Sequence, residues 1–163
     1  MEKNLYQEYT DFQEFYDDCK TAVNSVRQVF KGNIKQTVNF IRSNYEKEFL
    51  NAYYSAAELP PYLVKVLQSN TAVIKFSADT MIKNILEHPE ITVSEYLNIR
   101  KYVKNAEYIL LKNTKNLIYF KIEDKIYQFV IKTTKDGCEN FITTFHKSGI
   151  KQLEKDLKRY KRI

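Results

Sequence analysis

The sequence contains no tryptophan, and its 163 residues include only three glycines, three prolines, two cysteines and two histidines. So few chain-breaking residues favour long helices and strands over a loop-rich fold. Cys19 and Cys138 lie far apart in the chain. Two such cysteines match no zinc-ligand spacing and make no disulfide framework. We expect a reduced protein with two unreactive thiols, a single disulfide being the alternative.

Sequence motifs of metal and cofactor enzymes are absent as well. There is no HExxH, no CxxC and no glycine-rich phosphate loop, so we expect neither a metal nor a cofactor. No apolar run reaches the roughly 18 to 20 residues that cross a membrane. The first four residues include two charges, and no apolar segment of a secretory signal follows them. These absences predict a cytoplasmic protein without membrane contact.

Aromatic residues and positive charge are what the chain has in quantity. It carries 13 tyrosines and 10 phenylalanines, enough for a substantial core, and its net charge is +6. That charge is uneven, because residues 1–19 hold six acidic residues against one lysine, whereas residues 147–163 hold seven basic residues against two acidic ones. The basic end could bind RNA, a membrane surface or the acidic start, or it could be a solvated helix face.

The first third of the chain has the pattern of two amphipathic helices. Apolar residues recur every three or four positions from Leu5 to Phe30 and again from Ile34 to Tyr53, with Gly32 between the two runs. This pattern predicts an antiparallel helical hairpin over residues 1–58, acting as a docking or packing element. The Pro60-Pro61 pair then marks a boundary, and residues 59–163 form the second predicted domain.

Residues 59–163 combine helices with strands. A strand over residues 73–76 precedes a helix that Ser77 caps and His88-Pro89 ends, and another helix follows to about Lys104. From Glu107 onward, β-branched and aromatic runs separated by turn residues predict four antiparallel strands over residues 108–111, 117–122, 126–132 and 140–146. A last helix begins near Gly149. The predicted fold class is α+β, a helical hairpin followed by helices on a small antiparallel sheet.

Alternation along the last two strands sorts their side chains. Tyr127, Phe129 and Ile131 share one face of their strand, so Lys132 lies on the other. In the next strand Phe141, Thr143 and Phe145 share a face, which leaves Thr144 and His146 opposite. If the aromatic faces form the core, Lys132, Thr144 and His146 project together from the outer face.

Several short motifs of residues 59–163 occur together in a characteristic order: Leu59-Pro60, residues 76–80, Lys83, residues 88–91, Tyr96, Tyr127, residues 130–137 and residues 140–145. Together they resemble the barnase/EndoU/colicin/RelE-like nuclease domains that phages encode, often fused to Mu-type head-morphogenesis proteins. The resemblance implies helices packed on a curved antiparallel sheet, with metal-independent cleavage of RNA.

The resemblance also suggests roles for individual residues. His88 matches the histidine at the end of the family's first core helix, Lys132 the lysine that ends the third strand, and Thr144 the polar residue of the fourth. A histidine at position 146 is not typical of the family, and no carboxylate clearly takes the role of general base. Polar positions of the family's helix match Ser77, Thr80 and Lys83.

RNA transesterification needs a base for the 2′-hydroxyl, an acid for the leaving 5′-oxygen and cations beside the phosphate. His88 and His146 are the candidate base and acid, in either order, with Lys132 and Thr144 completing the catalytic set. The alternatives are a helix C-cap for His88 and ordinary surface positions for the other three. The candidate substrate-binding residues, some of which could equally be cap or core residues, are Ser77, Thr80, Lys83, Lys147, Tyr119 and Tyr127.

The leading hypothesis from the sequence is therefore a phage or mobile-element endoribonuclease that needs no metal, with RNA, tRNA included, as its substrate. It would act in the host cytosol or be carried in the phage particle. The helical hairpin would bind a protein partner. The alternative is a non-catalytic interaction protein on the same fold, either a phage head component or an inhibitor of a host or phage protein.

Overall fold

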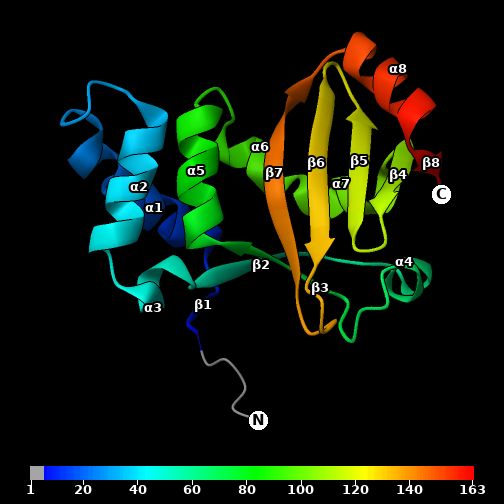
Figure 1. The fold of residues 1–163 in the computed structure, drawn as a ribbon, viewed down its shortest axis with the longest axis horizontal. Helices are drawn as coiled ribbons and strands as arrows, with labels where there is room; N and C mark the ends of the chain where they lie inside the picture. The colour runs from blue at the N-terminus through cyan, green and yellow to red at the C-terminus, as the bar shows by residue number, and fades with distance from the viewer. Residues whose placement is uncertain (1–5) are drawn as a thin grey trace. The chain divides into compact units, whose positions relative to one another are not determined.

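The computed structural model describes residues 6–163 (Figure 1). Helices and strands alternate irregularly along the chain, as expected for an α+β protein. The strands are β1 (Glu8–Tyr9), β2 (Tyr53–Glu58), β3 (Val73–Ser77), β4 (Tyr108–Asn113), β5 (Asn116–Ile122), β6 (Ile126–Thr133), β7 (Asn140–Ser148) and β8 (Lys161–Arg162). The helices are α1 (Phe12–Arg27), α2 (Ile34–Asn44), α3 (Lys47–Leu50), α4 (Pro61–Val66), α5 (Ala78–Glu87), α6 (Val93–Leu97), α7 (Ile99–Asn105) and α8 (Ile150–Arg159).

Within residues 6–163 the eight strands form one mixed sheet in the order β1-β2-β3-β7-β6-β5-β4-β8. The prediction of a small four-stranded antiparallel sheet is wrong, although the class α+β is right. The four predicted strands are present as β4–β7 and pair antiparallel. The sheet continues past β7 because β3 pairs with it in parallel, and past β4 because β8 adds an antiparallel strand.

The predicted helical hairpin is also wrong in its second half. The helix α2 ends at Asn44, and Tyr53–Glu58 forms the strand β2, whose Tyr53 pairs with Glu8 of β1. The apolar residues before Tyr53 recur every four positions, as in a helix. Pairing with a distant segment nevertheless decides that Tyr53 forms a strand. The helix α1 begins after Asp11, whose side chain accepts from the Gln13 N–H; the predicted start at Leu5 lies outside the described residues.

The chain divides into two compact units. Unit 1 comprises residues up to 55 together with 76–93, and unit 2 comprises 56–75 and 94–163. In unit 1 the helices α1, α2 and α5 pack together (Figure 1), with Phe15, Cys19 and Met81 fully buried. The capping prediction for α5 is confirmed, because Ser77 Oγ accepts from the Thr80 N–H. The division into a docking element and a nuclease domain near residue 58 stays a prediction.

Unit 2 places helices on both faces of the sheet. The helix α8 packs Leu153 and Leu157 on one face, against a buried cluster with Leu110, Ile118 and Phe120. We call this the α8 face. The opposite, α7 face carries Tyr127 and Phe145, whose rings contact Tyr102 of α7 and Tyr96 of α6. The sequence predicted a single helix running to about Lys104, whereas the structure has two short helices there, α6 and α7.

The positive charge of the protein belongs to unit 2. This unit holds 18 lysines and arginines against 9 aspartates and glutamates, a net charge of +9, whereas unit 1 holds 8 against 11, a net charge of −3. Unit 2 is therefore the part of the chain suited to a polyanionic partner. No helix within residues 6–163 has the length and apolar character needed to cross a membrane.

Candidate functional site on the β6–β7 surface

The pairing of β6 with β7 brings three of the predicted catalytic residues to one face. Gln128 pairs with His146, Val130 with Thr144, and Lys132 with Phe141. Paired residues share a face and successive residues alternate, so Lys132, Thr144 and His146 all lie on the α8 face. Lys132 is exposed, and Thr144 and His146 are half-buried.

A β-bulge in β7 changes part of the predicted sorting. The pairing shifts by one residue between Thr144, opposite Val130, and Ile142, opposite Ile131. Phe141 therefore lies on the α8 face and Ile142 in the core, the reverse of what strict alternation predicts. The polar residues keep their common face because the bulge falls between Phe141 and Thr144.

Thr144 and His146 form the closest polar contact of this surface. The Oγ1 atom of Thr144 lies 3.3 Å from Nδ1 of His146. When Nδ1 carries the proton, it donates to the threonine hydroxyl, and Nε2 is then the acceptor nitrogen of the ring. An imidazole oriented in this way can accept a proton from a bound substrate.

Gln128 is a candidate site residue that the sequence analysis did not single out. It lies opposite His146 and is buried, and its Oε1 atom has no hydrogen-bond partner. A buried acceptor without a donor costs free energy, which a donor on a bound ligand would recover. The signal was visible, since Gln128 is the polar residue in an otherwise apolar and aromatic stretch from Ile126 to Ile131.

Lys132 lies near Thr144 but farther from His146. It is diagonal to Thr144, a relationship that places Cα atoms about 7–8 Å apart. From the pair Gln128–His146 it is four residues along β6, which amounts to about 13 Å. At that distance Lys132 is better placed to bind the phosphate next to the one that faces His146 than to bind that phosphate itself.

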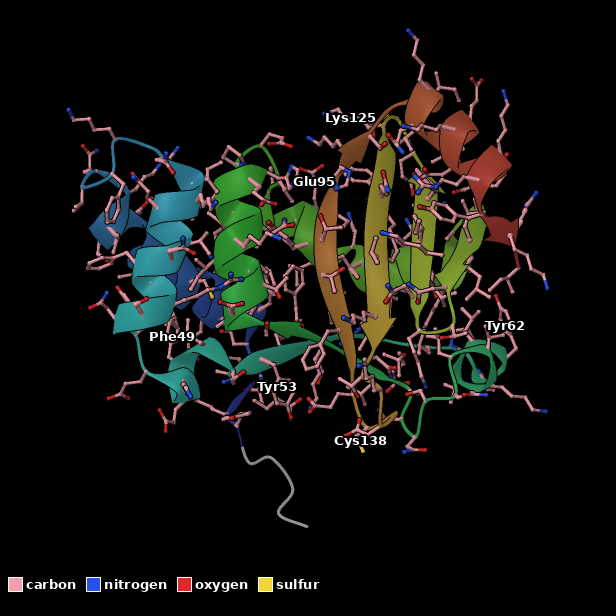
Figure 2. All side chains as sticks on the ribbon, viewed as in Figure 1. Phe49, Tyr53, Tyr62, Glu95, Lys125 and Cys138 are labelled. Carbon is pink, nitrogen blue, oxygen red and sulfur yellow. The ribbon has the colours of Figure 1, made fainter. Side chains whose placement is uncertain are left out.

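Two of the predicted substrate-binding residues, Tyr127 and Lys147, lie on the α7 face, and both contact Glu95 of α6. The Tyr127 hydroxyl donates to Oε2 of Glu95, and Nζ of Lys147 lies 3.4 Å from the same oxygen. Figure 2 places Glu95 beside β7. Desolvation by burial, and then the bond to Glu95, raise the pKa of Tyr127. These contacts make Tyr127 and Lys147 part of the packing between α6 and the sheet.

Tyr119, the other predicted stacking residue, lies deep in unit 2. Its side chain is 0% exposed and its ring stacks on Phe129 with centroids 4.7 Å apart. Burial raises the pKa of its hydroxyl, which has no hydrogen-bond partner. Stacking of a base on this ring would require the core to open.

The remaining predicted residues belong to unit 1. His88 is the C-cap of α5: its backbone N–H donates to the Asn84 carbonyl at 2.8 Å, and its Nδ1 lies 3.8 Å from Oε1 of Glu90. The hydroxyl of Ser77 also donates to that of Thr80 at 3.1 Å, and Lys83 lies 3.9 Å from Glu87 one turn along the helix. These contacts lie within α5 or at its ends. The catalytic role of His88 and the substrate-binding roles of the other three residues stay predictions.

The predicted site residues thus belong to both units of the chain. Lys132, Thr144 and His146 share a surface of unit 2, and His88 with its helix belongs to unit 1. Within residues 6–163 no three histidine, cysteine, aspartate or glutamate side chains gather as metal ligands would. Neither cysteine is in a disulfide.

Comparison of the chain with protein-family models, with curated proteins and with solved structures finds no match. The resemblance to phage-encoded nuclease domains therefore stays a prediction.

Proposed function

We propose that unit 2 binds RNA and cleaves it without metal at the α8 face of β6 and β7. The observation that carries the proposal is the contact of Thr144 with His146, on the same face as Gln128 and Lys132. The net charge of +9 on unit 2 supports a polyanionic substrate. As a phage or mobile-element protein, the molecule would act in the host cytosol or be carried in the phage particle.

In the proposed reaction, Nε2 of His146 takes the proton of a ribose 2′-hydroxyl. The 2′-oxygen bonds to phosphorus, the bond from phosphorus to the 5′-oxygen breaks, and the 5′-oxygen leaves with a proton from water. The products are a 2′,3′-cyclic phosphate and a 5′-hydroxyl. Thr144 orients the imidazole, and Lys132 holds the neighbouring phosphate.

The test is incubation of the purified protein with tRNA and with total RNA in EDTA, followed by assay for 2′,3′-cyclic phosphate ends. His146→Asn should lower the cleavage rate by about 100-fold or more, in line with the loss of a general base. Thr144→Val should lower it less, because the imidazole remains. Activity that is absent from the wild-type protein, or unchanged in His146→Asn, would overturn the proposal.

The other histidine supplies the matched control. His88→Asn removes the same chemical group from unit 1 and should leave cleavage near the wild-type rate, if His146 acts alone with solvent as the acid. Equal loss of cleavage in both variants would instead support the acid–base pair of His88 and His146 expected from the sequence. Circular dichroism of each variant checks that the fold is intact.

A second candidate function is protein binding through α1 and α2. Three large apolar side chains of this segment are exposed: Val29 at 66%, Phe40 at 39% and Ile34 at 38%. Phe40 also contacts the ring of Phe30, 5.5 Å away between centroids. A phage or host protein that covers these side chains would protect the amides of α2 from hydrogen exchange, whereas an RNA ligand of unit 2 would not.

A further inference from the structure

The exposed side of α8 carries a row of cations with few counter-charges. Lys151, Lys155 and Arg159 follow one another at intervals of four residues, so they lie on one side of the helix about 6 Å apart along its axis. All three are exposed, and no described carboxylate lies within ion-pair distance of them. We use the name basic strip for Lys151, Lys155, Lys158, Arg159 and Arg162.

Like charges four residues apart on a helix repel, so the strip weakens α8 when nothing neutralises it. Glu154 is the one exposed acidic residue on the helix. A linear polyanion would turn this repulsion into attraction, because its phosphates succeed one another at a spacing comparable to that of the cations. Binding would also release the counterions of those phosphates.

Two arginines of the basic strip lie over tyrosine rings. The guanidinium Cζ of Arg162 lies 4.5 Å from the centre of the Tyr108 ring, and Nη2 of the same residue donates to the Glu107 carbonyl at 3.2 Å. Arg159 lies 5.2 Å from the ring centre of Tyr160. A planar cation held in place by a ring and a carbonyl is well suited to stack on an unpaired base or to bind a phosphate.

The apolar side of α8 is already used. Leu153 is buried and Leu157 and Tyr160 pack with it on the sheet, in the cluster that contains Leu110 and Ile118. A helix that binds a membrane surface needs its apolar side for the lipid. The geometry therefore favours a nucleic acid over a lipid surface as the occupant of the basic strip.

We infer that the basic strip binds single-stranded RNA along the exposed side of α8, with Arg159 and Arg162 offering stacking positions. The identity of the polyanion rests on the proposed function, since RNA is its substrate. The basic strip belongs to unit 2, as does the Thr144–His146 pair, and it adds affinity for a long RNA strand. A dinucleotide is too short to bind the strip and the Thr144–His146 site together, so the strip adds nothing to its affinity.

The binding test compares two triple variants by fluorescence anisotropy with a labelled oligouridylate at several salt concentrations. Lys151→Gln/Lys155→Gln/Arg159→Gln should raise Kd at least tenfold and reduce the slope of log K against log salt by about 2, as expected when three single-strand phosphate contacts are lost. The control Lys65→Gln/Lys101→Gln/Lys104→Gln changes the charge of exposed positions in unit 2 by the same amount. It should leave Kd within threefold of the wild-type value.

A further variant separates stacking from charge. Arg162→Lys keeps the cation but not the planar group over Tyr108, so affinity should fall while the salt slope stays the same. Equal weakening by both triple variants, or weakening by neither, would overturn the inference. So would binding of phosphatidylserine vesicles by the wild-type protein without binding of the oligonucleotide.

Cleavage of a dinucleotide distinguishes this inference from the proposed function. If the dinucleotide is cleaved through His146 but the basic strip does not affect oligonucleotide binding, the inference fails and the proposed function survives. If the strip binds the oligonucleotide but no RNA is cleaved, the proposed nuclease function fails and the RNA-binding surface survives.

Discussion

The hydroxyl of Tyr127 on β6 donates a hydrogen bond to the Glu95 carboxylate on α6, and Lys147 of β7 lies 3.4 Å from the same oxygen. Tyr127→Phe removes the donor and leaves the half-buried carboxylate with one contact fewer. We expect the free energy of unfolding to fall by about 1–3 kcal/mol. Urea denaturation measures this change. The control is Tyr62→Phe, an exposed tyrosine on α4 (Figure 2), which should change stability little. Equal midpoints for the two variants would contradict a structural role for the Glu95 contact.

Stability should fall in alkaline solution because the pKa values of five tyrosines are raised, mainly by burial. These residues are Tyr9, Tyr16, Tyr102, Tyr119 and Tyr127. Their ordinary pKa is 10.0, so above pH 10 the unfolded chain loses these protons before the folded one does. Each such group stabilises the fold below that pH and ceases to do so as the pH rises. The part of the tyrosinate absorbance near 295 nm that these five residues contribute should therefore appear together with loss of circular dichroism, and a full rise for all tyrosines near pH 10 in a still-folded protein would contradict this.

The two cysteines should differ in reactivity, although the sequence predicted two unreactive thiols. Burial raises the pKa of Cys19, which is 0% exposed in unit 1 and has its Sγ 3.9 Å from the Ala78 carbonyl. Cys138 is exposed in the turn between β6 and β7 (Figure 2). Because the thiolate is the reactive form, native protein should react with one equivalent of DTNB and denatured protein with two. Cys138→Ser should abolish the native reaction, and fast reaction of both thiols in the native state would contradict the assignment.

Replacement of each of the three glycines by alanine should lower stability by a different amount. A Cβ on Gly137, at φ +76°, would lie 2.7 Å from the Gln68 carbonyl oxygen, whereas Gly32 has φ +80° but open space around it. Gly149 has neither constraint. Replacement of Gly32 by alanine should lower the free energy of unfolding by about 1–2 kcal/mol, and replacement of Gly137 should lower it further. Replacement of Gly149 should lower it by less than about 1 kcal/mol. Thermal melts of the three variants should follow this order; a Gly137→Ala protein as stable as Gly149→Ala would contradict it.

Local sequence signals predicted the segments that depend on local physics. The Ser77 cap places the start of α5, and the turn residues between β4 and β7 separate the four strands. Contacts between distant segments decided the rest. Tyr53 forms a strand because Glu8 pairs with it 45 residues away in sequence, and nothing in the helical spacing before it reports this.

The candidate site was predicted in part for the same reason. Alternation placed Lys132, Thr144 and His146 on one face, and the register agrees. The bulge before Thr144 and the bond between Glu95 and Tyr127, 32 residues apart, follow from packing and could not be seen in the sequence. The sequence shows Tyr127 and Lys147 as polar groups available to a substrate, whereas in the fold both contact Glu95.

The two outermost strands of the sheet have a consequence for solubility. β1 and β8 are each two residues long, and Glu8, Lys161 and Arg162 in them are charged and exposed. Short, charged margins offer few unpaired backbone groups to the β-structure of another copy. Without β8, the apolar six-residue β4 would stand at the border of the sheet. β8 thus pairs with backbone groups of β4 that a strand from another molecule could otherwise use.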